Sequence, residues 1–268
     1  MSIRKGVGVK KLAVFVRKHY KKPLIMVGFL LAWQMFIVIT GVKEYIVPSP
    51  LATFGRLFDP ETAAQYKWLM HIRATVSEII IAFSVTALSG ITVAILITWS
   101  NLLRGVITPV LTLLNSLPKI ALAPLFVLWF GYGLVPNIMI AVLIGFFPVI
   151  INTAAGLNAV DEDLLDLVRY LHGTKWQIFS KIRIPNSLPY MFAGFRISST
   201  LCVVGVIVGE FVASSKGLGY LIRESQAMID TPTMFASLIL LSILGLSLFG
   251  IISALEKVFI HSGGIELT

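Results

Sequence analysis

Long apolar segments recur along the chain, and very few charged residues interrupt them. A helix needs roughly 20 mostly apolar residues to cross a membrane. Six segments approach or exceed that length: residues 24–41, 79–103, 104–130, 138–157, 191–212 and 231–255. Residues 131–137 contain two glycines and a proline, and they separate the third segment from the fourth as a turn. The pattern therefore predicts an all-α integral membrane protein with six spans.

Composition and charge support a membrane protein with a defined orientation. Only 13% of the residues are charged, whereas soluble domains carry about 25%. The net charge is +9, and Lys and Arg gather in residues 1–22 and in the loops after the second, fourth and sixth spans. This distribution predicts cytoplasmic termini rather than nucleic acid binding. We expect a basic cytoplasmic N-terminus over 1–22, a six-span domain over 23–257 and a cytoplasmic tail over 258–268.

The loop between the fourth and fifth spans, residues 158–190, differs in pattern from the rest of the chain. Asp161 can cap a helix whose leucines recur at helical spacing, and Gly173 can end it. A second short helix is expected over 175–181, and Pro185 and Pro189 are expected to break the chain before the fifth span. Two short amphipathic helices need a partner surface for their apolar faces, so the pattern predicts a docking element. The alternative is a pair of helices lying on lipid.

The segment 166–185 resembles the cytoplasmic loop of permease subunits of binding-protein-dependent ABC importers. Their pattern is Glu-Ala-Ala, three residues, Gly, nine residues, Ile, one residue, Leu-Pro. Here the family's Gly place is occupied by His172, and Gly173 follows one step later. Either Gly173 takes over the turn, or the docking geometry differs from that of the family. The remaining places are filled by Asp166, Leu167, Val168, Ile182, Ile184 and Pro185.

The resemblance extends from about residue 47 to 257. Segments 47–50, 117–131, 147–152, 209–211 and 217–222 are similar to permeases of the sulfonate, nitrate and taurine branch. Within that branch, residues 75–78, Lys119 and residues 230–231 look more like permeases for aromatic or heterocyclic nutrients, which include pyrimidine thiamine precursors, riboflavin and phthalate-like acids. The resemblance implies the six-helix type I importer permease fold, with coupling helices between spans four and five, in the inner membrane of a prokaryote.

The resemblance also implies the partners of the chain. They are a second permease copy in a homo- or heterodimer, two ATP-binding subunits that use ATP and Mg, an extracytoplasmic substrate-binding protein, and membrane lipid. The chain itself has no Gly-x-x-x-x-Gly-Lys-Ser/Thr phosphate loop, so it cannot bind ATP by that route. We expect no cofactor on this chain and a small organic substrate, anionic or aromatic and heterocyclic.

The sequence offers two sets of candidate site residues, one for coupling to the ATPase and one for the translocation pathway. The resemblance assigns coupling to the ATPase to Asp166, Leu167, Val168, Arg169, His172, Gly173, Trp176, Phe179 and Pro185. Ionisable groups are costly inside a membrane and usually face a cavity or a partner. On this ground Lys119 (with Pro118 before it), Glu210 and Glu78 are pathway or gate candidates. For Glu78 and Arg196 the alternative is that they reach water at the membrane interface.

No catalytic or metal centre is expected, because the four histidines are scattered and none forms a ligand pair at helical spacing. The competing function is a secondary transporter or channel that works without an ATPase. Such a protein would use the same spans and intramembrane charges but would not need the docking element. An intramembrane enzyme is disfavoured, because no catalytic constellation is present.

Overall fold

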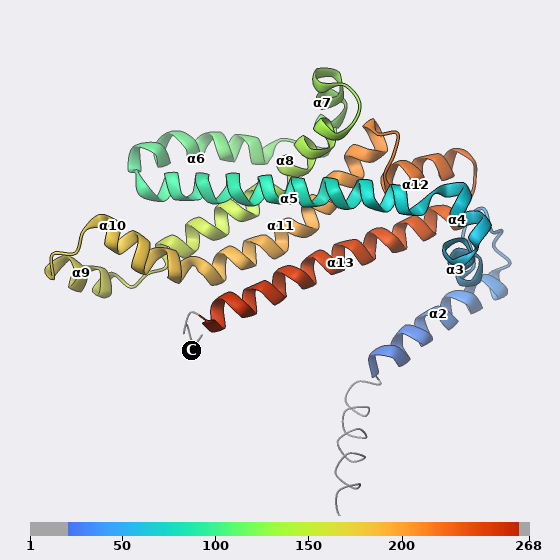
Figure 1. The fold of residues 1–268 in the computed structure, drawn as a ribbon, viewed down its shortest axis with the longest axis horizontal. Coiled ribbons are helices and arrows are strands. Elements are labelled where there is room, and N and C mark those ends of the chain that lie inside the picture. Colours follow the sequence, from blue (N-terminus) through green and yellow to red (C-terminus); the bar gives the residue numbers. More distant parts are fainter. Residues whose placement is uncertain (1–20, 263–268) are drawn as a thin grey trace, which may run out of the picture. The chain divides into compact units, whose positions relative to one another are not determined.

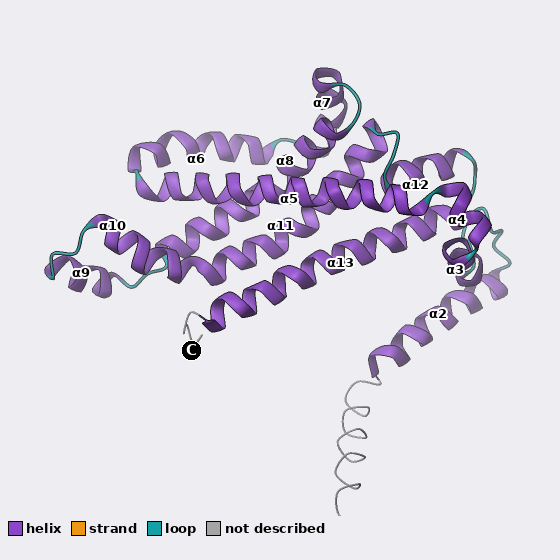
Figure 2. Ribbon diagram, in the orientation of Figure 1, coloured by secondary structure: helices purple, strands orange, loops and turns teal. Residues whose placement is uncertain are grey.

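The computed structural model describes residues 21–262, and every regular element in that range is helical (Figures 1 and 2). The described residues form two compact units: one holds residues 21–65 together with Ser225–Ala236, and the other holds Tyr66–Glu224 together with residues 237–262. The elements in order are α2 (Lys21–Thr40), α3 (Pro50–Phe58), α4 (Pro60–Tyr66), α5 (Trp68–Trp99), α6 (Asn101–Ser116), η1 (Lys119–Leu122), α7 (Ala123–Phe130), α8 (Leu134–Asn158), α9 (Glu162–Tyr170), α10 (Lys175–Ile178), η2 (Phe179–Arg183), α11 (Ile184–Ala213), α12 (Leu218–Ala227) and α13 (Thr231–Ser262).

Short polar contacts hold the first unit together. The Asp59 carboxylate accepts hydrogen bonds from the backbone N–H and the hydroxyl of Thr62 in α4. The hydroxyl bond lowers the pKa of Asp59 below its usual range. The Thr231 hydroxyl donates to the Tyr45 carbonyl at 2.7 Å. Segment 225–236 is therefore fastened to the loop that follows α2, although it lies far away in sequence.

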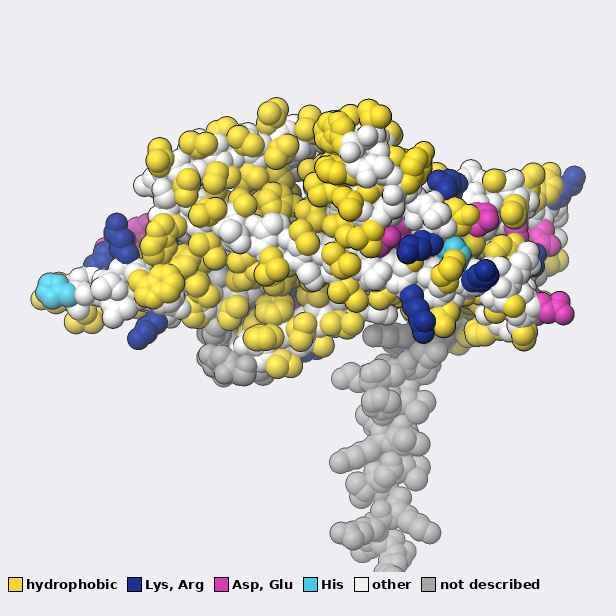
Figure 3. All heavy atoms as spheres, turned by 45° about the horizontal axis from the view of Figure 1, so that its top comes forward, with side chains coloured by type: hydrophobic (Ala, Val, Ile, Leu, Met, Phe, Trp, Pro, Cys, Tyr) yellow, Lys and Arg dark blue, Asp and Glu magenta, His cyan; other side chains and the backbone are white. Residues whose placement is uncertain are grey.

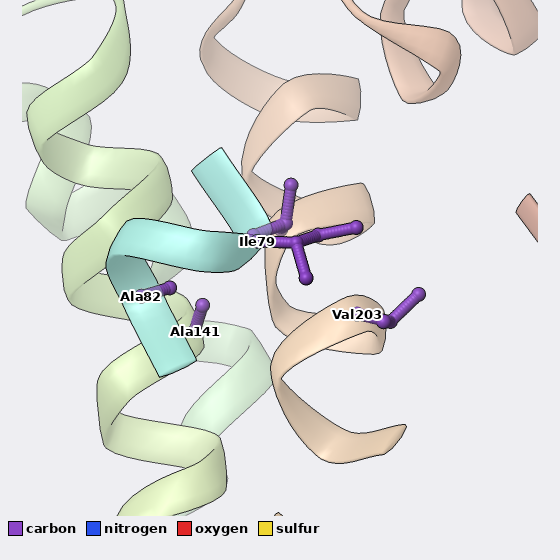
Figure 4. Close-up of a cluster of buried hydrophobic side chains, with 5 residues drawn as sticks. Ile79, Ala82, Ala141 and Val203 are labelled. Atoms are coloured by element: carbon purple, nitrogen blue, oxygen red, sulfur yellow. The ribbon is translucent and has the colours of Figure 1, made fainter. Parts of the chain in front are cut away.

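The core of the second unit lies where α5, α8 and α11 meet. Ile79 and Ala82 of α5 pack against Ala141 of α8 and Val203 of α11 (Figure 4). Close packing depends on glycine where two helices cross: a Cβ at Gly90 of α5 would lie 2.7 Å from the Val149 side chain of α8. Small residues of this kind let membrane helices approach closely.

Four helices in the described residues are long and apolar enough to span a membrane, namely α5, α8, the continuous stretch Lys175–Ala213 and α13. A fifth span is obtained if α6 and the η1–α7 pair are counted as one bent unit. The first predicted span forms α2, but its apolar part, Leu24–Thr40, is shorter than these. The turn predicted over 131–137 is present but shorter. It covers residues 131–133, since α7 ends at Phe130 and α8 begins at Leu134.

Three predictions about the spans were wrong in detail. The second span begins at Trp68 rather than at residue 79. The third does not run straight over 104–130, because the chain bends by 86° between Ser116 and Lys119. Leu117 precedes a proline and is extended, as the proline ring requires. The expectation that Pro185 and Pro189 break the chain was also wrong, since both lie inside α11.

A π-helical turn explains how the chain passes Pro185 without a break. Residues Phe179–Arg183 form this turn directly before α11. A proline ring normally clashes with the carbonyl four residues earlier, and it also removes one backbone donor. The wider π turn places that carbonyl differently, so α10, the π turn and α11 form one continuous helical stretch.

The outer surface of the second unit is apolar along its middle. In Figure 3 the face formed by α5 to α8 is largely hydrophobic, and charged side chains gather at its two ends, one of which is formed by α9 and α10. In the most apolar 18-residue segment of α13, only 11% is buried within the chain. A surface of this kind suits lipid or another protein chain rather than water.

Candidate functional site

The first helix of the loop 158–190, α9, forms as its capping signals predict. Asp161 is its N-cap, and the carboxylate accepts a hydrogen bond from the Asp163 N–H at 2.9 Å. Acidic residues occupy the first turn and Arg169 the last, which complements the helix dipole. Asp166 pairs with Arg169 at 2.7 Å, and both side chains are largely exposed. This pair therefore lies on the surface of the loop, where a partner can reach it.

The turn after α9 is made by His172 rather than by Gly173. His172 has a φ of 55°, in the left-handed region that glycine adopts most easily. Gly173 has an ordinary φ, but its backbone N–H donates to the Val168 carbonyl at 2.8 Å. A Cβ at Gly173 would lie 2.5 Å from the Val168 side chain. The prediction that Gly173 ends the helix was therefore wrong in detail: His172 makes the turn and Gly173 permits the close approach.

A small core anchors the loop and leaves other apolar groups exposed. Val160, Leu165 and Ile178 are buried together, with Val168 and Ile182 against them. The loop thus buries part of its own apolar face, more than its sequence suggested. The exposed apolar side chains are Leu164, Leu167, Tyr170, Leu171 and Trp176.

The second helix is shorter than expected, since α10 ends at Ile178 and the π turn follows. A capping box between Thr174 and Gln177 fixes its start. Phe179 is the first residue of the π turn and is buried, whereas Trp176 is 65% exposed. The nine predicted coupling residues therefore follow one another along α9, the turn after it, α10, the π turn and the first turn of α11, where Pro185 lies.

Glu210, near the end of α11, lies in a buried polar cluster. Its side chain is fully buried. One carboxylate oxygen accepts from the Thr75 hydroxyl of α5, and the other accepts from the Gly219 N–H, both at 2.6 Å. The Thr75 oxygen accepts in turn from the Leu218 N–H at 2.8 Å. Glu210 and Thr75 together fasten the loop between α11 and α12 to α5.

Two further residues of α5 extend this cluster. Glu78 is 1% exposed and accepts a hydrogen bond from Asn137 of α8 at 2.9 Å. The ring Nδ1 of His71 lies 3.0 Å from both the N–H and the carbonyl oxygen of Gly217. The alternative that Glu78 reaches water is therefore contradicted. We call the group His71, Thr75, Glu78, Asn137 and Glu210 the buried polar cluster.

Sequence reasoning named Glu78 and Glu210 but missed three members of this cluster. The available signal was spacing, because His71, Thr75 and Glu78 recur at intervals of four and three residues and so share one helical face. Asn137 offered no such signal, since it follows a turn and its partner lies on another helix. Arg196 also has a partner: it forms an ion pair with Glu256 of α13 at 2.8 Å.

Lys119 lies at the bend of the third span and makes its contacts there. Its ammonium donates to the Asn115 side chain at 2.7 Å and lies 5.2 Å from the centre of the Phe147 ring. Pro118 lies immediately before it at the bend. Irregular backbone at membrane depth is tolerated where it is buried in protein or lines a cavity.

No group of His, Cys, Asp or Glu within residues 21–262 could hold a metal ion.

Comparisons with known proteins point to one family. Residues 87–260 match the model of the binding-protein-dependent transport system inner membrane component. The chain is 37% identical to a probable ABC transporter permease of Haemophilus influenzae, over 90% of this chain and 97% of that one. It is 32% identical to the formylaminopyrimidine transport permease ThiX of Halalkalibacterium halodurans, over 88% and 93% of the two chains.

A solved structure shares the fold. The inward-facing MetNI methionine ABC transporter contains a chain that matches with a TM-score of 0.62 and 20% identity, covering 72% of this chain and 97% of that one. The predicted all-α importer permease fold and the family resemblance are thereby confirmed.

Proposed function

Because this chain belongs to the family of inner membrane components of binding-protein-dependent transport systems and is a permease subunit of an ABC importer, we propose that it forms half of a translocation pathway. It is a transport component rather than an enzyme. The other half is a second permease copy. Two ATP-binding subunits, which carry ATP and Mg, and an extracytoplasmic binding protein complete the importer.

The coupling loop, which we define as residues 158–190, is the proposed contact with the ATP-binding subunits. The observation that carries this proposal is the exposed apolar side chains on an ordered, internally anchored loop. Trp176 and Tyr170 are 65% and 83% exposed at the end of the second unit that α9 and α10 form, where charged side chains also lie (Figures 1 and 3). An anchored loop of this kind can transmit a push, because its small core resists deformation.

The proposed mechanism is alternating access. ATP brings the two ATP-binding subunits together and displaces the coupling loops. Each loop is continuous with α11, so its displacement changes how α11 packs against α8 and α5. Directional transport then requires that the substrate bind the inward-open and outward-open states with different affinity.

The experiment that tests the coupling loop compares Asp166→Lys and Gly173→Trp with the wild type in the assembled importer. We expect both variants to reach the membrane, because both positions lie in the loop and outside the helix crossings. Both should uncouple ATP hydrolysis from uptake, since one reverses the charge on the exposed face and the other pushes the turn away from Val168. Normal transport in both variants would refute the loop assignment.

Affinity purification of the chain separates this proposal from the competing one, a secondary transporter or channel that works without an ATPase. A co-purifying ATP-binding subunit supports the importer, whereas uptake by the isolated chain along an ion gradient would support a secondary transporter.

For the substrate we propose a small anionic or heterocyclic nutrient. The resemblance to permeases of that kind supports it, and so does the similarity to a formylaminopyrimidine transport permease. Lys119, with no carboxylate within salt-bridge distance in the described part of the chain, offers a positive charge beside the Phe147 ring. Lys119→Glu should abolish uptake of such a substrate while surface expression is unchanged. Uptake by this variant at the wild-type level would refute the assignment of Lys119 to the pathway.

A further inference from the structure

A cluster of three aromatic rings joins the coupling loop to a helix that is not continuous with it. Trp99 is the last residue of α5. Its ring lies edge-on to Phe179 with centroids 5.0 Å apart, and edge-on to Trp176 at 6.2 Å. Trp176 and Phe179 stack on each other at 6.4 Å. We call Trp99, Trp176 and Phe179 the inner aromatic cluster.

Phe179 lies where the coupling loop joins α11, so its contact with Trp99 can affect how the loop moves. Phe179 begins the π turn through which α10 continues into α11. It is only 6% exposed, so its ring is held firmly between the loop and the bundle. Edge-on aromatic pairs contribute about 0.5–1.5 kcal/mol beyond the area that they bury. The loop is therefore attached to α5 at the point where it joins α11.

The opposite end of α5 is attached as well. Thr75 is bonded to Glu210 and to the Leu218 N–H, and His71 is bonded to Gly217, so this end holds the loop between α11 and α12. Between these residues and Trp99 the helix has no proline and no break. At 1.5 Å per residue its 32 residues span about 48 Å. An unbroken helix of this length can carry a displacement from one end to the other.

We propose that Trp99 is a positioning residue that couples the loop to α5, so that a displacement of the loop moves α5 together with α11. This inference rests on the proposed docking of the coupling loop to an ATP-binding subunit. It adds a second route from that subunit to the far end of the bundle, through side-chain contact rather than through the continuous backbone of α11.

The test measures the movement of α5 in the whole permease–ATPase complex. Spin labels are placed on introduced cysteines at Leu69 of α5 and Val135 of α8, which are both exposed at the end far from the loop. The native Cys202 is buried, so labelling is selective. The probe is ATP with vanadate, and the readout is the fraction of complexes in which the distance between the labels changes.

The variants are Trp99→Ala, Trp99→Phe and the control Leu102→Ala. Leu102 lies three residues beyond Trp99 and is 77% exposed. We expect Trp99→Ala to lower the shifted fraction about fivefold. Trp99→Phe keeps a ring and should retain the shift, and the control should match the wild type. If Trp99→Ala does not fold, Trp99→Leu fills the same space without a ring and takes its place.

The outcomes separate this inference from the proposed function. Equal shifts in Trp99→Ala and the wild type, with the ATP-binding subunit bound to both, would overturn the role of Trp99 and leave the coupling loop intact. Absence of any shift in the wild type would also overturn it. Failure of the wild type to bind an ATP-binding subunit would instead refute the proposed function, and this inference with it.

Discussion

At the scale of single residues, the turn between α9 and α10 shows how a departure from the family's pattern is accommodated. The family's glycine place is the position where the chain needs a positive φ, and His172 adopts it here at 55°. For a residue with a Cβ, this conformation costs about 1 kcal/mol of free energy. His172 therefore carries a strain that a glycine would not.

His172→Gly should accordingly stabilise the turn. We expect the loop amides of the purified chain to exchange hydrogen about fivefold more slowly. Gly173→Ala is the matched variant with the opposite sign, because its Cβ would lie 2.9 Å from the Val168 carbonyl oxygen. It should speed exchange in the same amides. Equal exchange in the two variants would show that neither residue controls the turn.

Thr75 is the second residue whose contribution can be measured. Its hydroxyl both donates to Glu210 and accepts from Leu218, so Thr75→Val leaves two buried groups without their partner. We expect a loss of about 1–3 kcal/mol in stability, seen as a lower midpoint of thermal unfolding. The control is Thr92→Val, since the Thr92 hydroxyl bonds only to the Leu88 carbonyl of its own helix. A Thr75→Val protein as stable as the control would contradict the role of the buried polar cluster.

At the scale of elements, apolar runs predicted where spans exist but not how they end. α5 continues eleven residues before the predicted start at 79, because His71 and Thr75 find buried partners on other elements. Such partners are set by tertiary packing, and a single helix's periodicity does not contain them. The bend at Pro118 was visible as a proline, but its angle of 86° depends on the packing of η1 and α7 against α8.

The bend at Pro118 leads to a prediction about which residues near it are accessible to water. If the irregular backbone at Pro118 lines an aqueous pathway, a cysteine at Ile120 should react with a water-soluble thiol reagent. Ile120 is exposed in η1, and Leu113 is similarly exposed on α6 before the bend. We expect Leu113→Cys to react at least severalfold more slowly, as a lipid-facing residue would. Equal reactivity at the two positions would place the bend outside the pathway.

At the scale of the whole molecule, the coupling loop and the loop between α11 and α12 lie at opposite ends of the 30-residue helix α11 (Figure 1). A helix of that length spans about 45 Å, enough to cross the membrane with the loops on opposite sides. The positive charges of the coupling loop, Arg169, Lys175, Lys181 and Arg183, predict that this loop lies on the cytoplasmic side. On this prediction, the loop between α11 and α12 lies on the opposite, outer side of the membrane.

This orientation can be tested with two single cysteines in intact cells. Lys175 lies exposed in the coupling loop and Lys216 lies exposed in the loop between α11 and α12. We expect a membrane-impermeant maleimide to label Lys216→Cys from outside, and to label Lys175→Cys only after the membrane is permeabilised. The buried Cys202 provides the background level in the unmodified chain. The reverse pattern would place the coupling loop outside the cell, where no ATP-binding subunit could engage it, and would remove the basis of both proposals together.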